Sequence, residues 1–403
     1  MTQRTSSMVR LVLVGACAAS VSSAWAGAAP ESAGGPQGQA KPTSKGFAVA
    51  TGDGTKISFG GNAQFRYTAN VRDTDDVGDN NDFTHGFKNR RVRLSTQGSV
   101  IDPKLTFRVD GDFLNGEDLT LYEMTGAYKF DSGVQVKWGQ FKLPLVQEEL
   151  NSFLKLQAVE RSTVNSVFTQ NYSQGVEVSR VWESFRLAGA FSDGLNTINT
   201  DITAAPEADW AVTGRAEWKW AGEWSQYEQF SSWRGSGYAG FLGVAGHWQS
   251  GGSTNGTNDV DVGQYTVDLS LKGDGWNVYT QFVGRRTDAA AAREEFDDFG
   301  LIVQGGVFVT EQTEAFLRYD HVFVDDDRET SPGVGGEDFP TITAGVVHYV
   351  SPRSHVFKIT ADVVWHLESQ ADAGTVVKPS TSTGLLASDK SQVLFRVQTQ
   401  IVW

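Results

Sequence analysis

The feature that most constrains this chain is a strict alternation of apolar and polar residues, which is clearest in its last segment, "QVLFRVQTQIVW" (392–403). Phe395 and Ile401 belong to the apolar face of this segment, whereas Arg396 and Gln398 belong to the other face. Alternation of this kind indicates a β-strand, because successive strand residues point to opposite sides. The strand fits either a soluble sandwich, with its apolar face packed on a second sheet, or an outer-membrane barrel, with that face toward lipid.

The same period recurs along most of the sequence, beginning at Lys56 with "ISFGGNAQFRYTANVR". Further runs lie at roughly 88–100, 105–114, 119–130, 133–140, 174–182, 185–192, 210–220, 237–249, 262–272, 276–286, 297–309, 314–323, 341–350, 355–367 and 391–403. We therefore expect about sixteen strands, an even number within the range of bacterial outer-membrane barrels.

The segments between these runs alternate between short turns and longer, mostly acidic loops. Turns such as "IDPK", "DSG" and "GDG" are short, whereas 73–87, 141–173 and 368–390 are long. Short turns at one rim and long loops at the other are typical of a membrane barrel with both termini in the periplasm. Two connections break the pattern, because 115–118 is short where a long loop is due and 221–237 is long where a short turn is due.

Aromatic residues favour the membrane barrel over the soluble sandwich. The chain has 12 Trp and 24 Phe, and several Trp residues stand near the ends of the alternating runs, as interfacial girdles require. Downstream of the N-terminal segment, no stretch approaches the roughly 18 to 20 apolar residues of a membrane helix, so strands would have to span the bilayer. Trp403 also resembles the C-terminal aromatic residue by which such barrels are recognised for assembly.

The N-terminus has the pattern of a secretory signal. Residues 1–26 contain Arg4 and Arg10, a short apolar run and the small-x-small sequence Ala24-Trp25-Ala26, which predicts export and cleavage. The only cysteine, Cys17, lies in this segment, so the mature chain can form no internal disulfide. Residues 27–50 are rich in Gly, Ala, Pro and Ser and are expected to be a flexible periplasmic segment, followed by the barrel at 51–403.

The charge distribution suggests an anion-selective pore inside an acidic protein. Loss of residues 1–26, with their two Arg and no acid, changes the formal charge from −14 to −16, which argues against a nucleic-acid partner. The polar faces of the runs nevertheless carry more basic than acidic residues, and arginine forks suit oxyanions. The basic residues are Arg66, Arg72, Arg91, Arg93, Arg108, Lys129, Lys137, Arg186, Arg215, Lys219, Lys272, Arg285, Arg318, Lys358 and Arg396. The alternative is that many of these charges pair across strands, as Arg215 could with Glu217 and Arg318 with Asp320.

The long segment at 141–173 is the second candidate feature. Helical spacing of apolar residues after Pro144 predicts a short helix, and a loop of this length in a barrel is usually functional. If it folds inward it narrows the pore, and Lys142, Lys155 and Arg161 could then supply the constriction charge. The alternative is an external helix that caps the barrel or contacts a neighbour.

From about residue 55 to Trp403 the chain resembles the phosphate-selective porin O/P family. The resemblance is carried by "NRRVRLSTQGSV", "WGQFKLPL" with "ERS" downstream, "AGAFSDGLN", "YTVDLSLKGDGWNVYTQF", "DDFGLIVQGGVFV" with "AFLRYDHV", and "ITAGVVHYVSPRSHVFKITADVV". It implies a homotrimer of sixteen-stranded barrels in the outer membrane, each with an Arg-lined pore and an inward loop whose lysines bind phosphate.

The resemblance also assigns roles to individual residues. Lys142 matches the lysine of the family's "GQFK" motif, and the positions where pore-wall basic residues are expected hold Arg91, Arg93, Arg108 and Arg215. The chain departs from the family in the constriction, where "KLPLVQEELNSFLKLQ" has the acidic pair Glu148 and Glu149 and no dense lysine cluster.

The sequence thus predicts an all-β fold, a sixteen-stranded antiparallel transmembrane barrel with long external loops, one of them folded into the pore. Its predicted function is passive diffusion of small anions such as phosphate, in contact with outer-membrane lipid and lipopolysaccharide. The predicted anion-binding or pore-lining residues are Arg66, Arg91, Arg93, Arg108, Lys137, Lys142, Lys155, Arg161, Arg215, Arg285, Arg318, Lys358 and Arg396. No cofactor, metal site or catalytic constellation is expected, because no His pair has ligand spacing and no nucleophile–base motif is present. A general, weakly selective porin is the first alternative, and a carbohydrate-binding or enzymatic barrel is the second.

Overall fold

A computed structural model describes residues 41–43, 46–50, 55–72, 82–113, 119–204, 207–251, 260–289, 294–328, 336–374 and 376–403. The predicted signal peptide at 1–26 lies outside the described residues, as do 27–40, most of the acidic loop at 73–87 and the short connection at 115–118. Among the described residues, no helix combines the length and apolar character needed to cross a membrane.

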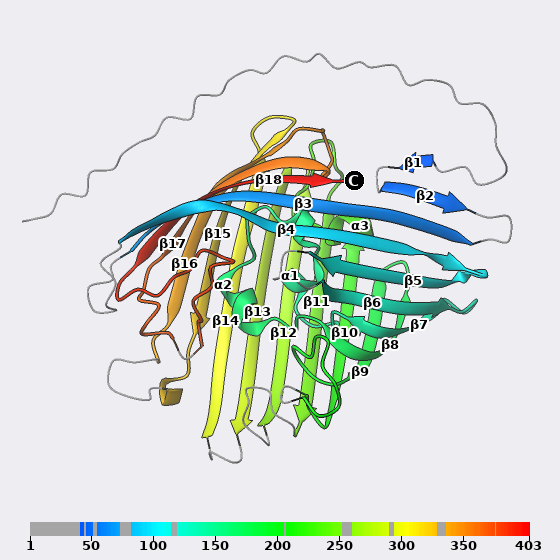
Figure 1. Cartoon of the computed structure of the whole chain (residues 1–403), viewed down its shortest axis with the longest axis horizontal. Helices are drawn as coiled ribbons and strands as arrows, with labels where there is room; N and C mark the ends of the chain where they lie inside the picture. Colours follow the sequence, from blue (N-terminus) through cyan, green and yellow to red (C-terminus); the bar gives the residue numbers. More distant parts are fainter. Residues whose placement is uncertain are drawn as a thin grey trace, which may run out of the picture. The chain divides into compact units, whose positions relative to one another are not determined.

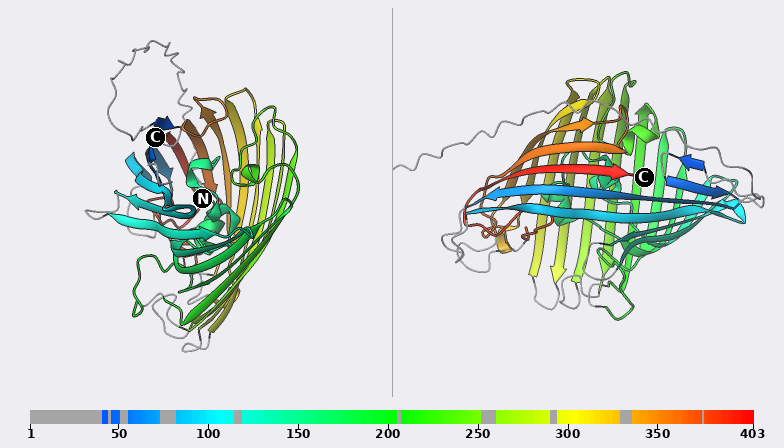
Figure 2. Two further views of the ribbon diagram at one scale, coloured as in Figure 1. Left: turned by 90° about the vertical axis from the view of Figure 1, so that its right-hand side faces the viewer. Right: turned by 45° about the horizontal axis from the view of Figure 1, so that its top comes forward.

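The main body of the protein is a closed antiparallel barrel of sixteen strands, as the sequence predicted. The strands are β3 (Lys56–Val71), β4 (Phe83–Val100), β5 (Asp102–Asp112), β6 (Thr120–Lys129), β7 (Val134–Phe141), β8 (Ser173–Val181), β9 (Phe185–Ser192), β10 (Trp210–Ala221), β11 (Ala239–Ser250), β12 (Val260–Gly273), β13 (Trp276–Ala289), β14 (Glu294–Phe308), β15 (Thr313–Phe323), β16 (Phe339–Tyr349), β17 (Phe357–His366) and β18 (Gln392–Val402). Each strand pairs with its sequence neighbours, and β18 pairs with β3 to close the barrel (Figures 1 and 2).

Burial along β18 decides which face meets the interior. Phe395 and Ile401 are 45% and 50% exposed, whereas Arg396 and Gln398 on the alternate face are each only 3% exposed. A soluble sandwich would bury the apolar face, so this inverted pattern is that of a barrel whose outer surface faces lipid.

The chain ends at the barrel seam. The Trp403 backbone N–H donates to the Gly61 carbonyl oxygen at 2.9 Å, and the Gly61 N–H donates to the Trp403 oxygen at 2.9 Å. The Trp403 ring covers Gly61 so closely that a Cβ at this glycine would lie 2.7 Å from the ring. The terminal aromatic residue therefore completes the pairing between the last strand and the first.

The segment at 27–50, which the sequence predicts to be flexible, forms two short strands where the structure describes it. It contains β1 (Lys41–Thr43) and β2 (Gly46–Ala50), and β2 pairs with the start of β3. Phe47 stacks on Phe59 with ring centroids 5.0 Å apart. This aromatic pair stabilises the pairing of β2 with β3. The composition of the segment, rich in small residues, did not predict it.

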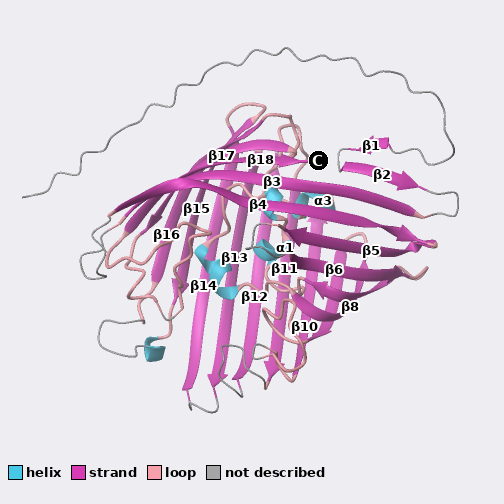
Figure 3. Ribbon diagram, viewed as in Figure 1, coloured by secondary structure: helices cyan, strands magenta, loops and turns pink. Residues whose placement is uncertain are grey.

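Three connections fold into the barrel interior. They are the long loop (142–172), the inner turn (222–238) and the C-terminal loop (367–391), and the helices of the first two lie within the ring of strands (Figures 1 and 3). The long loop contains α1 (Gln147–Leu150), η1 (Phe153–Lys155) and α2 (Thr163–Phe168), and the inner turn contains α3 (Trp224–Tyr227). A further short helix, η2 (Asp326–Arg328), lies between β15 and β16.

A single apolar cluster holds these three connections against one side of the barrel wall. It includes Leu156, Val164 and Phe168 of the long loop, Phe230 of the inner turn, Val377 and Leu385 of the C-terminal loop, and Tyr279, Val283 and Ile302 of the wall. The inner turn is longer than expected because it extends into the barrel, where Phe230 packs in this cluster. The prediction of an inward long loop is confirmed, and the external alternative is wrong.

Candidate functional site

The strand that leads into the long loop, β7, contains a glycine near its end that no other residue could replace without strain. Gly139 has φ +114°, and a Cβ on it would lie 2.1 Å from the carbonyl oxygen of Met124 on the neighbouring strand. Beyond this point Leu143, Leu145 and Val146 are fully buried and pack against Phe141 and other residues of a second apolar cluster. The sequence thus turns the chain inward at the end of β7 and keeps it there by burial of apolar side chains.

Caps and polar anchors fix the helices of the long loop. The Ser162 hydroxyl accepts a hydrogen bond from the Asn165 N–H at 2.9 Å, which caps α2. The Thr163 N–H donates to Asp320 Oδ1 at 2.8 Å, and the Val159 N–H donates to Asp362 Oδ2 at 2.9 Å. Barrel carboxylates therefore bind backbone N–H groups of the loop as well as basic side chains.

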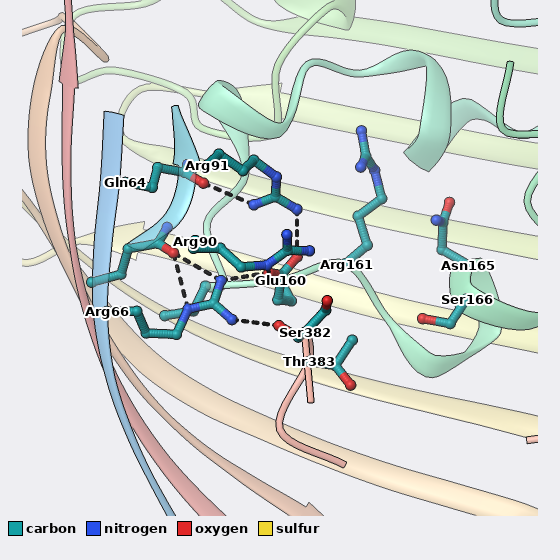
Figure 4. A network of polar contacts seen from close by, with 12 residues as sticks. Gln64, Arg66, Arg90, Arg91, Glu160, Arg161, Asn165, Ser166, Ser382 and Thr383 are labelled. Carbon is teal, nitrogen blue, oxygen red and sulfur yellow. Dashed lines mark hydrogen bonds and ion pairs between the residues drawn. The ribbon is translucent and has the colours of Figure 1, made fainter. Parts of the chain in front are cut away.

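Three arginines of the barrel wall converge on one carboxylate of the long loop, Glu160 (Figure 4). Arg90 Nε donates to Glu160 Oε1 at 2.6 Å, Arg91 Nη2 donates to Oε2 at 2.9 Å, and Arg66 Nη2 also donates to Oε1. Burial would raise the pKa of Glu160, but Arg91, Arg66 and Arg90 outweigh burial and hold that pKa well below its usual range. Glu160 is therefore an anion at neutral pH. We call Arg66, Arg90 and Arg91 the arginine cradle.

Arg90 joins the cradle because β4 has a bulge. Gln64 pairs with Arg91 and Phe65 pairs with Asn89, so Arg90 is an extra residue with no partner of its own on β3. In a regular strand Arg90 and Arg91 would point to opposite faces. The alternation of the strand predicted that Arg91 faces the interior and did not predict this for Arg90. The sequence shows no clear signal for the bulge.

On the other side of the long loop, four basic side chains line a cavity of about 250 Å³. Arg161 comes from the long loop, Lys378 from the C-terminal loop, and Arg318 and Arg396 from the wall. Hydroxyl groups of Thr163, Ser166, Thr341, Ser380 and Thr383 also belong to lining residues. Among the described residues that line it there is no Asp or Glu, so they offer cations and hydroxyl donors to this space.

Carboxylates lie within ion-pair distance of three of these cations. Asp362 accepts two hydrogen bonds from Arg396, at 2.8 Å each. Arg318 Nε lies 3.3 Å from Asp320 Oδ2, and Arg161 Nε lies 3.3 Å from Glu149 Oε2. The predicted pairing of Arg318 with Asp320 is therefore present as an ion pair, while Arg318 Nη1 donates a hydrogen bond to the Glu160 carbonyl oxygen at 3.1 Å.

A second group of predicted residues lies on the wall formed by β4 to β8. Arg93 donates to Asp112 at 3.0 Å, Arg108 donates to Asp110 at 2.6 Å, and Lys137 lies 2.8 Å from Glu177. Lys137 and Lys142 line a cavity of about 390 Å³ together with Arg186, Glu177, Glu217 and Glu228. This second space has mixed charge, which distinguishes it from the cavity beside Arg161.

Lys142 and Glu149 form an ion pair at the base of the long loop, with Nζ and Oε1 2.7 Å apart. Burial lowers the pKa of Lys142 to about 8 despite this partner. Burial would raise the pKa of Glu149, but Arg161 and Lys142 overcome it and lower the pKa to about 2. Glu149 therefore keeps its charge across the neutral range, whereas Lys142 loses its proton in mildly alkaline solution.

The remaining predicted residues anchor loops or stand apart. Arg215 is buried between Glu217 and Asp268, Lys358 Nζ donates to the Leu156 carbonyl oxygen at 2.6 Å, and Arg285 Nη2 donates to the Val167 oxygen at 2.6 Å. Lys155 is half-buried in η1, and its side chain makes no hydrogen bond or ion pair with any residue that the structure describes. The structure thus separates the predicted basic residues into cavity-lining groups and groups that hold the long loop.

Sequence reasoning missed three residues of this region: Arg90, Glu160 and Lys378. Glu160 belongs to the "ERS" motif but was assigned no role, and Lys378 lies in a loop with no periodic pattern. Within the described parts of the chain, no group of three or more His, Cys, Asp or Glu side chains could hold a metal ion.

Solved structures of outer-membrane proteins share this fold. An anion-selective porin from Comamonas acidovorans is 12% identical, with a TM-score of 0.60 over 87% of this chain and 100% of its own. The outer membrane channel DcaP of Acinetobacter baumannii is 11% identical, with a TM-score of 0.56 over 89% of this chain and 100% of its own. OmpT of Vibrio cholerae, in its trimer form, is 12% identical, with a TM-score of 0.55 over 87% of this chain and 99% of its own. At these identities the likeness establishes the fold.

A search of curated protein sequences gave no match. The sequence profile of one family, described as phosphate-selective porin O and P, matches residues 62–383, which include most of β3, all of β4 to β17, the long loop and most of the C-terminal loop. The inverted burial of the barrel wall and the inward long loop agree with that match. The chain therefore belongs to the phosphate-selective porin O and P family and is an outer-membrane porin.

Proposed function

We propose that this porin passes small oxyanions, with phosphate the foremost candidate, and that the cavity lined by Arg161, Arg318, Lys378 and Arg396 is its selective site. The observation that carries the proposal is the composition of this lining, whose described residues include four basic side chains and several hydroxyl groups but no carboxylate. Guanidinium groups and hydroxyls match the acceptor oxygens of phosphate, and many weak sites in series let an ion leave as well as enter.

The transport mechanism is electrostatic and involves no covalent chemistry. Asp362 holds Arg396 through two hydrogen bonds, and the Glu160 carbonyl oxygen and the Thr343 hydroxyl accept hydrogen bonds from Arg318, so both orientations are fixed before an ion arrives. Lys378 is exposed on the C-terminal loop and, among the described residues, its ammonium hydrogen-bonds only the Gly374 carbonyl oxygen, so its charge can meet an entering anion. An anion that reaches the cavity exchanges water for these donors, and the neighbouring carboxylates limit how tightly it is held.

The chain is further proposed to act as a homotrimer after removal of residues 1–26. The outer face of β3 and β4 supports an apolar contact surface, because Phe65 and Phe87 are 48% and 72% exposed and stack with centroids 5.6 Å apart. Electrophoresis of unheated protein with and without cross-linking would test the trimer, and N-terminal sequencing of the mature protein would test cleavage after Ala26.

The function is tested on purified protein in a planar bilayer. The reversal potential in a KCl gradient should report preference for chloride over potassium, and added phosphate should reduce the chloride current. Anion preference without phosphate block would leave a general anion porin. Cation preference would contradict the proposal and point to the acidic loops as the dominant charges.

A further inference from the structure

The cavity beside Arg161 has an apolar side as well as a cationic one. Besides the four cations and the hydroxyl groups, its described lining residues include six apolar ones: Val167, Val364, Val376, Val377, Pro379 and Leu385. Val167 belongs to α2 and Val376 to the C-terminal loop, and both are half-buried and pack against the apolar cluster that joins the three inward connections. The cluster covers one part of each valine, and the cavity borders another. Apolar surface of this kind gains free energy when an apolar group replaces the water beside it.

The hydrogen-bond donors that the lining offers to a ligand are concentrated in its cations. The Ser166 hydroxyl donates to the Ser162 carbonyl oxygen at 3.2 Å, and the Thr383 hydroxyl donates to the Ser380 carbonyl oxygen at 3.0 Å. Both Ser166 and Thr383 are drawn in Figure 4. Since each hydroxyl has a single hydrogen, these two groups use their donors within the protein. A ligand therefore finds its donors on the cationic side of the cavity.

This division suits an anion whose charge is at one end. Inorganic phosphate has acceptor oxygens on every side, so those that face the valines would lose hydrogen bonds to water without replacement. A carboxylate on an apolar body has acceptors at one end only, and its two oxygens match the fork of a guanidinium. Sites for small organic ligands usually combine an apolar lining with a few placed polar groups. The volume of about 250 Å³ is small for such a site and limits the apolar body to about one ring.

We propose that the cavity beside Arg161 binds small monocarboxylates that carry an apolar body, such as single-ring aromatic acids, in addition to inorganic oxyanions. The carboxylate meets the cations of the lining, and the apolar body lies against Val167 and Val376. These two valines give the channel a preference among anions of equal charge. The inference rests on the proposed anion channel, since the ligand must reach the cavity through the lumen, and it names a substrate class for the same site.

Benzoate and acetate test the proposal, because these two carboxylates differ in their apolar body. Each is added at neutral pH to the purified protein in a planar bilayer, and the concentration that halves the chloride current is measured. We expect benzoate to half-block the wild-type channel at a concentration about ten-fold lower than acetate, because its ring covers apolar surface of the two valines. Equal half-blocking concentrations would overturn the proposal.

Val376→Thr locates the effect, because threonine has nearly the shape of valine but replaces a methyl group by a hydroxyl. The ratio of the acetate to the benzoate half-blocking concentration should fall from about ten-fold to about three-fold. Val167→Thr should lower the ratio in the same way from the long loop, and it keeps the test decisive if Val376→Thr does not fold. A ratio that both variants leave at the wild-type value would show that benzoate acts elsewhere, for example through the lipid, and would overturn the proposal.

Leu150→Thr is the matched control. Leu150 is also a half-buried apolar residue of the long loop, but it lines the mixed-charge cavity together with Lys142. The ratio of half-blocking concentrations should stay at the wild-type value in this variant. A fall as large as that in Val376→Thr would show that any apolar residue in the lumen has the same effect, which would overturn the assignment to this cavity.

The organic-anion site and the proposed function fail separately. An anion-selective channel that phosphate blocks and that does not distinguish benzoate from acetate retains the proposed function and loses the organic-anion site. A benzoate preference that depends on Val167 and Val376, in a channel that phosphate does not block, supports the organic-anion site and removes phosphate as the foremost candidate.

Discussion

Arg90 Nε lies 2.6 Å from Glu160 Oε1, and this contact exists because a bulge in β4 lets two consecutive arginines face the interior. The bulge therefore converts a two-arginine contact with the long loop into a three-arginine cradle. Bulges re-aim side chains in this way at barrel walls and near functional sites. Arg90 is the most exposed of the three arginines, so its replacement changes the charge of the cradle with the least disturbance of packing.

Arg90→Gln should change the free energy of unfolding by no more than about 1 kcal/mol, in either direction. The Arg90 side chain is 18% exposed, and Glu160 keeps Arg66 and Arg91 as partners when Arg90 is lost. The cradle also loses one uncompensated charge, which offsets the lost hydrogen bond. Urea titration of the barrel refolded in lipid vesicles would measure the change, and a loss of several kcal/mol would show that Arg90 is essential to hold the loop.

Asp362→Asn should be far more harmful than Arg90→Gln. Asp362 accepts two hydrogen bonds from the buried Arg396 and a third from the Val159 N–H, so the variant leaves a buried guanidinium without its counter-charge. Breaking such a pair typically costs about 3 to 5 kcal/mol. The control is Asp131→Asn, because Asp131 pairs with Lys104 at the surface with side chains 89% and 40% exposed. Comparable losses in the two variants, again by urea titration, would show that burial does not decide the strength of these pairs.

The barrel wall could be predicted from the sequence because the alternation of exterior and interior residues applies to every strand. The main error was at β4, which begins at Phe83 rather than near 88. Its first residues pair with the end of β3, where Phe87 stacks on Phe65 on the outer face. Contacts with β3 therefore extend β4 to Phe83. The local sequence "FTHGF" shows no preference for a strand.

The candidate site could be predicted only in part. The period placed Arg66, Arg91 and Arg396 on the inner face, but it could not reveal whether an inner charge is free or engaged. Lys358 illustrates the limit, because its ammonium group holds the Leu156 carbonyl oxygen of the long loop. Such contacts depend on how the long loop and the C-terminal loop fold inside the barrel, and the helical spacing in the long loop predicts a helix but not which wall residues it contacts.

The anion preference should fall as the pH rises through about 8. Burial lowers the pKa of Lys142 to about 8, so the ammonium is charged below this pH and neutral above it, while Glu149 with its pKa of about 2 stays negative. We expect the ratio of chloride to potassium permeability to fall about two- to five-fold between about pH 7 and pH 9.5, as befits the loss of one partly screened charge. Lys142→Met should start from a lower ratio at neutral pH and lack this step; a step of equal size in the variant would assign it to another group.

The lowered pKa of Lys142 also determines how the free energy of unfolding changes with pH. Unfolded lysine keeps its proton to about pH 10.4, whereas Lys142 in the folded protein releases it at about pH 8. Between these values the unfolded state binds more protons, so the contribution of Lys142 raises the stability as the pH increases. The difference in unfolding free energy between wild type and Lys142→Met should therefore shift in favour of wild type across this interval.

Lys378→Glu should weaken anion selectivity without disturbing the barrel. Lys378 lines the cavity beside Arg161, and the only hydrogen bond of its side chain within the described chain is to the Gly374 carbonyl oxygen of its own loop. Reversal of one exposed charge changes the energy of an anion in this cavity by about 1 kcal/mol. The ratio of chloride to potassium permeability should therefore fall about five-fold. Lys104→Glu, near the start of β5 and outside the cavity lining, is the control. Unchanged selectivity in Lys378→Glu would remove this cavity from the permeation path.

Gly139→Ala should disturb the entry of the long loop into the barrel. A Cβ at Gly139 would lie 2.1 Å from the Met124 carbonyl oxygen, and φ +114° is unfavourable for alanine, so either β6 and β7 separate locally or the backbone rotates. The strain should cost about 3 kcal/mol. Gly246→Ala is the matched control, because a Cβ at this residue, on the outer face of β11, would meet nothing within 4 Å among the described residues. Heat-dependent mobility on gels would report the folded fraction and single-channel current the pore. Because Lys142 lies just beyond Gly139, a folded Gly139→Ala barrel should also have an altered current, and a wild-type current would show that the long loop folds in place independently of this glycine.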